Sequence, residues 1–271
     1  MNTRNAKTVE IALLQTATLS IDSAKLDYLL AQAKHRGATL AVLPEYVCNL
    51  FFKELESMPF AFVQAQGEKQ YENLRKLASQ YNMTVIAPLV RAQGGKIYKS
   101  IYRFSHDRTS RYDQRVFMDY AHWNEADYFE SSKRRDRPAI FNYHGFRIGL
   151  LAGFELHFDL LWQQLIARKV DCVIVPTAST FESFARWQTL LKSRSFTGGC
   201  YALRANRIGT YNDRSGAWEF YGNSLVCNPF GEIENALEDH EGMLIATLER
   251  SLITEARRAF GFSRIVASRL S

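Results

Sequence analysis

Three predicted strand ends carry residues whose types could support amide chemistry. The segment LAVLPEY contains Glu45, RYDQRVFM contains Arg115, and GLLAGFEL reaches Gly153 where a buried strand opens into a loop. Cleavage or formation of an amide through a thiolate needs a nucleophile, a nearby base and a cation that stabilises the developing oxyanion. Glu45 supplies a base and Arg115 a cation, but the third strand end holds a glycine where a reactive side chain is expected.

Alternating strand and helix patterns must bring these strand ends together. Hydrophobic periodicity predicts strands over 9–15, 39–45, 84–90, 98–105, 110–118, 170–177, 200–209 and 242–248, with helices over 66–80, 157–168 and 183–198. No linker or low-complexity segment interrupts this alternation. We therefore expect one domain spanning 1–271, with helices on both sides of the sheets and residues 1–8 as a flexible N-terminal tail.

The charge distribution argues against nucleic acid as a partner. The chain has 271 residues and a formal net charge of +6, and its basic residues are dispersed. The densest cluster is Lys133, Arg134 and Arg135 with Arg137 close by, and no nucleic-acid reader motif accompanies it. A solvated loop explains this cluster.

Apolar runs and cysteine usage indicate a reduced, cytoplasmic protein. No apolar run approaches the roughly 18–20 residues that span a bilayer, and the N-terminus has no signal-peptide pattern. The four cysteines are far apart and lack metal-ligand spacing. We expect no membrane association, no metal and no cofactor.

Four segments, taken in order, resemble the nitrilase, or carbon–nitrogen hydrolase, superfamily. They are LPE, WQTLLKSRSFTGGCYALRANRIG, FYGNSLVCNPFGEI and EGMLIATLERSLITEAR. The resemblance covers nearly the whole chain. It implies an α/β fold of four layers, an α-β-β-α sandwich with two stacked mixed sheets.

The resemblance also implies a site, from which this chain departs. The family's Glu, Lys and Cys positions fall on Glu45, Arg115 and Gly153. Phe154 matches an aromatic residue after the Cys, and Glu155 replaces an Asp. Many members have a second Glu, for which Glu125 is the nearest candidate and His122 is equally placed. Trp123 and Cys48 are further candidates for the pocket.

These departures predict a catalytically inactive protein, a pseudoenzyme with a binding or regulatory role. Glycine cannot form a covalent intermediate, and the guanidinium of Arg115 does not readily release a proton. The alternative is an active amidohydrolase in which Cys48 has replaced the nucleophile or Glu45 activates water. The retained cavity either binds a small polar ligand or is filled by its own side chains, leaving the surface to a protein partner.

Two geometric expectations follow. If Gly153 marks a lost nucleophile, its Cα lies at the strand end within a few ångströms (~3–5 Å) of Glu45 and Arg115. A distance well over about 10 Å from Glu45 would contradict this, because a base must reach its proton directly or through one water. Gly153→Cys should then fit the backbone. The resemblance further implies a homodimer through helices 157–168 and 183–198, where Leu160, Leu161, Trp162 and Leu165 cover more than one helix face.

Overall fold

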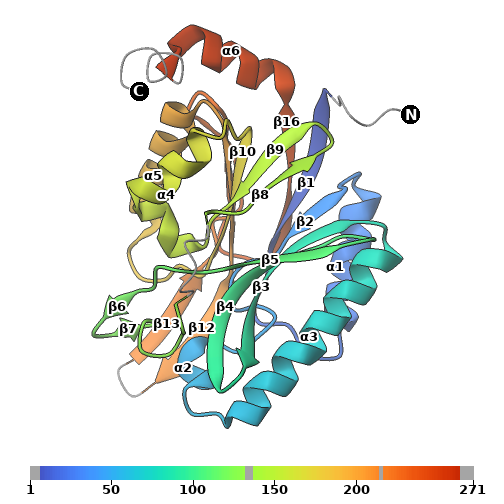
Figure 1. Ribbon diagram of the computed structural model, residues 1–271, viewed down its shortest axis with the longest axis vertical. Coiled ribbons are helices and arrows are strands. Elements are labelled where there is room, and N and C mark those ends of the chain that lie inside the picture. Colours follow the sequence, from blue (N-terminus) through green and yellow to red (C-terminus); the bar gives the residue numbers. More distant parts are fainter. Residues whose placement is uncertain (1–6, 132–136, 214–215, 263–271) are drawn as a thin grey trace.

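Two six-stranded mixed sheets stack face to face in the computed structural model, which describes residues 7–131, 137–213 and 216–262 (Figure 1). In spatial order the first sheet contains β16 (Gly242–Glu249), β1 (Thr8–Gln15), β2 (Leu40–Val42), β3 (Thr84–Gln93), β4 (Lys96–Phe104) and β5 (Thr109–Asp113). Within it β1, β2 and β3 run parallel, and the remaining neighbours are antiparallel.

The second sheet has the same plan of a parallel centre and antiparallel edges. In spatial order it contains β15 (Ile233–Ala236), β14 (Leu225–Cys227), β11 (Tyr201–Asn206), β10 (Cys172–Thr177), β9 (Phe146–Leu150) and β8 (Ile140–Tyr143). The strands β9, β10 and β11 are the parallel ones.

Alternation along the central strands builds three packed layers of side chains. In β1, Ile11 and Leu13 enter the core between the sheets, whereas Ala12 and Leu14 pack against the outer helices. In β10, Ile174 faces the core between the sheets and its neighbours face outward. Both faces of these strands are buried, which explains their continuous apolar sequences.

Helices cover the outer face of each sheet, which completes the predicted α-β-β-α sandwich. Figure 1 shows α1 (Ala24–His35) and α3 (Phe60–Gln80) against the first sheet, with α4 (Asp159–Ile166) and α5 (Phe184–Gly198) against the second. The remaining elements are α2 (Phe52–Leu55), α6 (Arg250–Phe260), a 3₁₀ turn (Gly153–His157), and the hairpins β6 (Asp119–Tyr120) with β7 (Trp123–Asn124) and β12 (Ile208–Asp213) with β13 (Gly216–Tyr221).

Several boundaries differ from the sequence-based prediction. The strand predicted over 110–118 ends at Asp113, so Arg115 lies beyond it. Thr8, assigned to the flexible tail, pairs with Glu249 in the first sheet. Residues 1–6 and the basic residues Lys133, Arg134 and Arg135 lie outside the described residues. Among the helices of the described ranges, none is long and apolar enough to cross a membrane.

Candidate functional site

Glu45 and Gly153 meet where the two sheets end on the same side. Glu45 follows β2 of the first sheet, and Gly153 begins the turn after β9 of the second. The Gly153 N–H donates to Glu45 Oε1 at 3.2 Å. The expectation that these two residues lie close together is confirmed.

The cation beside Glu45 is Lys99 of β4, which sequence reasoning missed. Its ammonium donates to Glu45 Oε2 at 3.1 Å and to Glu125 Oε1 at 2.9 Å. All three side chains are buried, and the Tyr46 hydroxyl also donates to Glu125. A lysine inside the mostly buried strand KIYKSIYRF is a signal that could have identified it, because lysine is rarely buried without a partner.

Burial and charge set the protonation of this cluster. Burial raises the pKa of Glu45 above its ordinary value, more than the nearby Lys99 ammonium lowers it. Burial disfavours the charged form of Lys99 and so lowers its pKa. The nearby Glu125 and Glu45 carboxylates outweigh this and hold the pKa of the ammonium above the ordinary value. Two carboxylates around one buried ammonium disfavour full ionisation of the cluster, which agrees with the direction of the Glu45 pKa.

Arg115 does not occupy the cation position predicted for it. Arg115 lies beyond the end of β5 at Asp113, and its backbone N–H donates to Glu155 Oε1 at 2.9 Å. Its side chain lines a surface depression with Phe117 and Phe129, and Glu45 does not border that depression.

Glu155 is buried and connects two elements of the fold. It is fully buried and accepts hydrogen bonds from the Tyr112 hydroxyl at 2.9 Å and from the backbone N–H groups of Arg115 and Ala152. Burial raises the pKa of its carboxyl. These bonds fix the turn after β9 to the end of β5.

A cavity of about 480 Å³ opens beside Glu45 and Gly153. Of the predicted pocket residues, His122, Trp123 and Phe154 line it, whereas Cys48 and Glu155 do not. Of the two candidates for the second Glu, Glu125 joins the buried cluster and His122 faces the cavity. The remaining lining residues come mainly from the segment after β10 and the start of α5: Thr177, Ala178, Ser179, Thr180, Phe181, Ser183, Arg186 and Trp187, with Met118, Tyr120 and His157.

Comparison with known proteins identifies the family. Residues 10–258 match the family model for carbon-nitrogen hydrolase. The chain belongs to the carbon–nitrogen hydrolase family.

Relatives within this family are distant in sequence and close in fold. The chain is 24% identical to omega-amidase NIT2 of Bos taurus, over 93% of this chain and 92% of that protein. Its match to human deaminated glutathione amidase, 24% identical, covers 41% of this chain and 34% of that protein. A carbon-nitrogen hydrolase from Helicobacter pylori G27 superposes with a TM-score of 0.85 at 23% identity, covering 95% of this chain and 94% of that one.

Cys48, the predicted relocated nucleophile, lies outside the cavity beside Glu45. Its side chain is 1% exposed and packs in the apolar layer beneath α1 and α3, with Val47 and Leu74. Burial raises the pKa of its thiol to about 12, which removes the reactive thiolate at neutral pH. All four cysteines lie in the described ranges, all are buried, and none lines the cavity.

The space for a side chain at Gly153 is occupied by the end of β10. A Cβ atom built on Gly153 would lie 2.9 Å from Thr177 Cγ2 and 3.1 Å from the Pro176 carbonyl oxygen. The Thr177 rotamer is fixed, since its hydroxyl donates to Asn206 Oδ1 at 2.8 Å and accepts from Arg204 Nε at 3.1 Å. The expectation that Gly153→Cys fits is therefore wrong for this backbone.

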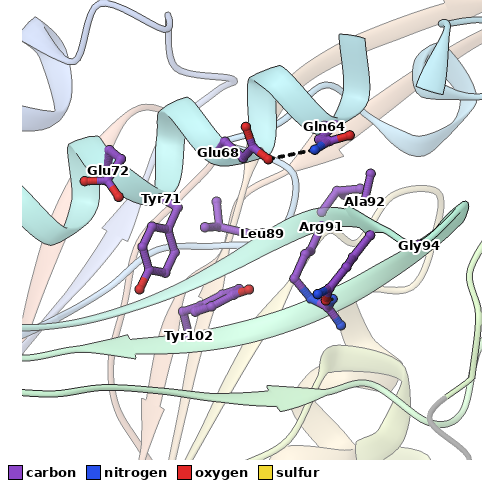
Figure 2. A pocket seen from close by; sticks show the side chains of 12 residues that line it. Gln64, Glu68, Tyr71, Glu72, Leu89, Arg91, Ala92, Gly94 and Tyr102 are labelled. Atoms are coloured by element: carbon purple, nitrogen blue, oxygen red, sulfur yellow. Dashed lines mark hydrogen bonds between the residues drawn. The ribbon is translucent and has the colours of Figure 1, made fainter. Parts of the chain in front are cut away.

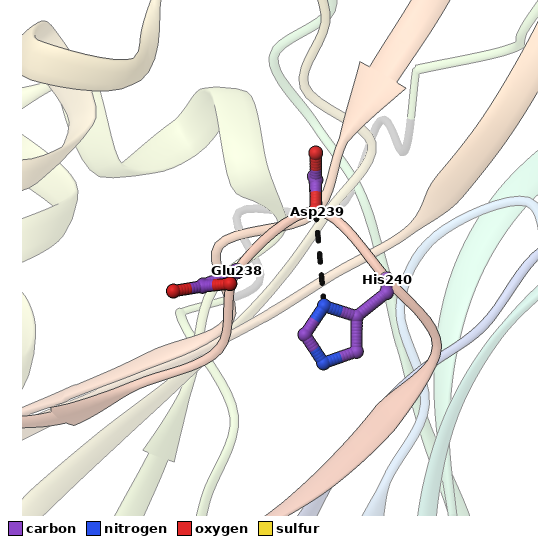
Figure 3. Close-up of side chains that lie close together, drawn as sticks. All are labelled: Glu238, Asp239 and His240. Carbon is purple, nitrogen blue, oxygen red and sulfur yellow. Dashed lines mark ion pairs between the residues drawn. The ribbon is translucent and has the colours of Figure 1, made fainter.

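Two surface features lie apart from this site. A groove of about 600 Å³ runs between α3 and the β3–β4 hairpin, where Figure 2 shows Gln64 bonded to Glu68 above Tyr71 and Tyr102. Glu238, Asp239 and His240 form an exposed group of consecutive residues, drawn in Figure 3, with His240 paired to Asp239 at 3.8 Å. Neither contributes a residue to the cavity beside Glu45.

Proposed function

We propose that this chain is a catalytically inactive carbon–nitrogen hydrolase that binds a small polar ligand in the cavity beside Glu45. The observation that carries the proposal is the environment of Gly153. No thiol is present there, and Thr177 occupies the space that a Cβ atom on Gly153 would need. A covalent route through a thiolate therefore has no nucleophile.

One structural neighbour has an active site cysteine. Solved structures of an amidase from Nesterenkonia sp. AN1 include one with acrylamide added at the active site cysteine. That amidase is 20% identical to this chain and superposes with a TM-score of 0.77. In our proposal this chain keeps the fold and the cavity of such proteins without the covalent chemistry.

Direct attack by water is the second candidate, and one observation favours it: Glu45 lines the cavity beside a buried ammonium. The same geometry weakens Glu45 as a base. One carboxylate oxygen already accepts from Gly153 and the other from Lys99. Burial also raises the pKa of Glu45, which favours its protonated form.

Thiol labelling separates an inactive site from one with a relocated nucleophile. We expect iodoacetamide to label the native protein slowly and to label all four cysteines in guanidinium, because each thiol is buried. Cys48→Ala serves as the matched variant for the predicted relocation. Rapid native labelling that disappears in Cys48→Ala, or that a cavity ligand blocks, would contradict the proposal.

We also propose a cytoplasmic homodimer that forms through the outer helices. The four cysteines are free thiols, which suits a reducing compartment. On α4, Leu160 is 68% exposed, whereas Leu161, Trp162 and Leu165 pack inside the chain. Phe184 of α5 is 45% exposed, so each helix presents an apolar side chain outward. Light scattering at micromolar concentration tests the dimer, and a monomer would contradict it.

A further inference from the structure

A short hairpin forms one side of the cavity beside Glu45. Its strands, β6 and β7, lie outside both six-stranded sheets (Figure 1). Tyr120, His122 and Trp123 of this hairpin line the cavity, together with Met118 just before it. Most other lining residues come from the turn after β9, the segment after β10 and the start of α5, which together we call the second-sheet wall. Two different parts of the fold therefore border the cavity.

The C-terminal end of the hairpin is held by aromatic packing and by the buried charged cluster. Trp123 is 4% exposed, and its ring centroid lies 5.1 Å from that of Phe51 and 5.4 Å from that of Trp218. Two residues later, Glu125 is paired with the Lys99 ammonium at 2.9 Å. This end of the hairpin is therefore fixed to the body of the protein.

The hairpin tip, residues 119–122, is attached much more loosely. All four of its residues are exposed, Tyr120 by 48%. The tip meets the second-sheet wall through two edge-to-face ring contacts, Tyr120 with Phe154 at 6.0 Å and His122 with Phe181 at 5.6 Å. Within the described residues, no hydrogen bond or ion pair joins the tip to that wall. Single ring pairs of this kind are weak, so the tip can separate from the wall at little cost.

Phe181 makes its contact with the tip from an unfavourable backbone conformation. Its φ is +58°, in the left-handed region where a residue other than glycine is uncommon. The residue is 49% exposed, and its ring packs on Trp218 at 4.8 Å besides the His122 ring. Strained backbone is concentrated at ligand clamps and switch regions. Here the strained residue lies at the contact between the tip and the second-sheet wall.

We infer that the hairpin tip is a lid that closes on Phe154 and Phe181 and lifts to admit a ligand to the cavity. The tip moves relative to the fixed end at Trp123, and lifting it separates two ring contacts. Tyr120 and His122 thereby select by size: small molecules pass beside the rings, and bulky molecules enter only when the lid is raised. The inference rests on the proposed binding function and deepens it by naming what controls access to the site.

A thiol introduced inside the cavity measures access without any ligand. Ser179→Cys is nearly isosteric, and Ser179 lines the cavity and is 7% exposed. The four native cysteines are buried, so labelling above the wild-type rate reports the introduced thiol. The rates of labelling by iodoacetamide, which is small, and by fluorescein maleimide, which is bulky, are measured separately at pH 7.5.

Removal of the two tip rings should open the cavity to the bulky reagent. In the Ser179→Cys background, we expect Tyr120→Ala with His122→Ala to accelerate labelling by fluorescein maleimide about fivefold or more and to change labelling by iodoacetamide less than about twofold. Tyr28→Ala with His35→Ala removes the same two side-chain types from exposed positions on α1 that do not line the cavity, and should change neither rate.

Phe181→Gly tests the same contact from the second-sheet wall. Glycine adopts a positive φ without strain, so this variant removes the ring while relieving the backbone, and it should accelerate the bulky reagent in the same way. Circular dichroism checks that each variant is folded.

Four results would overturn the lid. They are a bulky-reagent rate that neither variant raises, equal acceleration of both reagents, equal acceleration by the α1 control, and no labelling of Ser179→Cys by iodoacetamide in any variant. These rates are measured without ligand or amide, so such a result leaves the proposed function standing. Ammonia released from an amide would contradict the proposed function and leave the lid unaffected.

Discussion

The two sheets contribute unequally to the site. The first sheet side keeps a complete charged cluster, in which Lys99 lies between Glu45 and Glu125. The end of the second sheet has Gly153, which the sequence resemblance aligns with the family's cysteine, and Thr177 packs against it. The difference follows from energetics: a buried ion cluster cannot lose one member without leaving an uncompensated charge, whereas a thiol can be lost and its space filled. The interactions within the charged cluster stabilise it independently of any catalytic role.

Removing Lys99 should disrupt the charged cluster and have the largest effect on the free energy of unfolding. Lys99→Met leaves two buried carboxylates without their ammonium, and we expect the free energy of unfolding to fall by about 3–5 kcal/mol. Denaturant unfolding monitored by circular dichroism measures the change. Lys96→Met, three residues earlier on β4 and in an exposed pair with Glu130, is the control and should leave stability nearly unchanged. Equal effects of the two variants would show that the cluster contributes no special stability.

Adding a side chain at Gly153 tests how tightly the space beside this residue is packed. We expect Gly153→Cys to lower the free energy of unfolding by about 1–3 kcal/mol, because its Cβ would clash with Thr177 Cγ2 at 2.9 Å. Thr177→Ser removes that methyl group and keeps the hydroxyl. The double variant should therefore be more stable than the sum of the two single effects, by about 0.5 kcal/mol or more. Simple additivity would mean that the Thr177 methyl is not the obstacle.

The smallest expected effect is a pH dependence that comes from Glu45. Burial raises its pKa in the folded protein above the ordinary 4.5, so the folded state keeps a proton that the unfolded state releases. Below about pH 4.5 both states are protonated and stability is unaffected. As the pH rises above that value, the wild type should lose stability relative to Glu45→Gln, until the folded carboxyl also ionises. Unfolding at a series of pH values between 4 and 8 measures the difference, and a gap that is constant over this range would contradict the raised pKa.

Periodic patterns in the buried strands and amphipathic helices predicted the alternating elements, and the family resemblance implied their arrangement in four layers. The resemblance also placed Glu45 and Gly153 together, and both follow parallel strands at the side where the two sheets end. Lys99 was missed because it lies in mid-strand on β4, and its approach to Glu45 depends on the order of β2, β3 and β4 in the sheet. Arg115 was misassigned because the end of β5 could not be placed to within two residues. The fit of Cys at 153 depended on Thr177, which is 24 positions away in sequence.

The central claim is that this carbon–nitrogen hydrolase fold lacks catalysis, and ammonia release tests it most directly. The wild type and Glu45→Gln are incubated side by side with a panel of small amides, including acrylamide and benzamide, near neutral pH. We expect both proteins to release ammonia only at the rate of buffer, because none of the four cysteines borders the cavity and Glu45 is bonded at both oxygens. Ammonia released by the wild type above buffer, and abolished in Glu45→Gln, would contradict the claim.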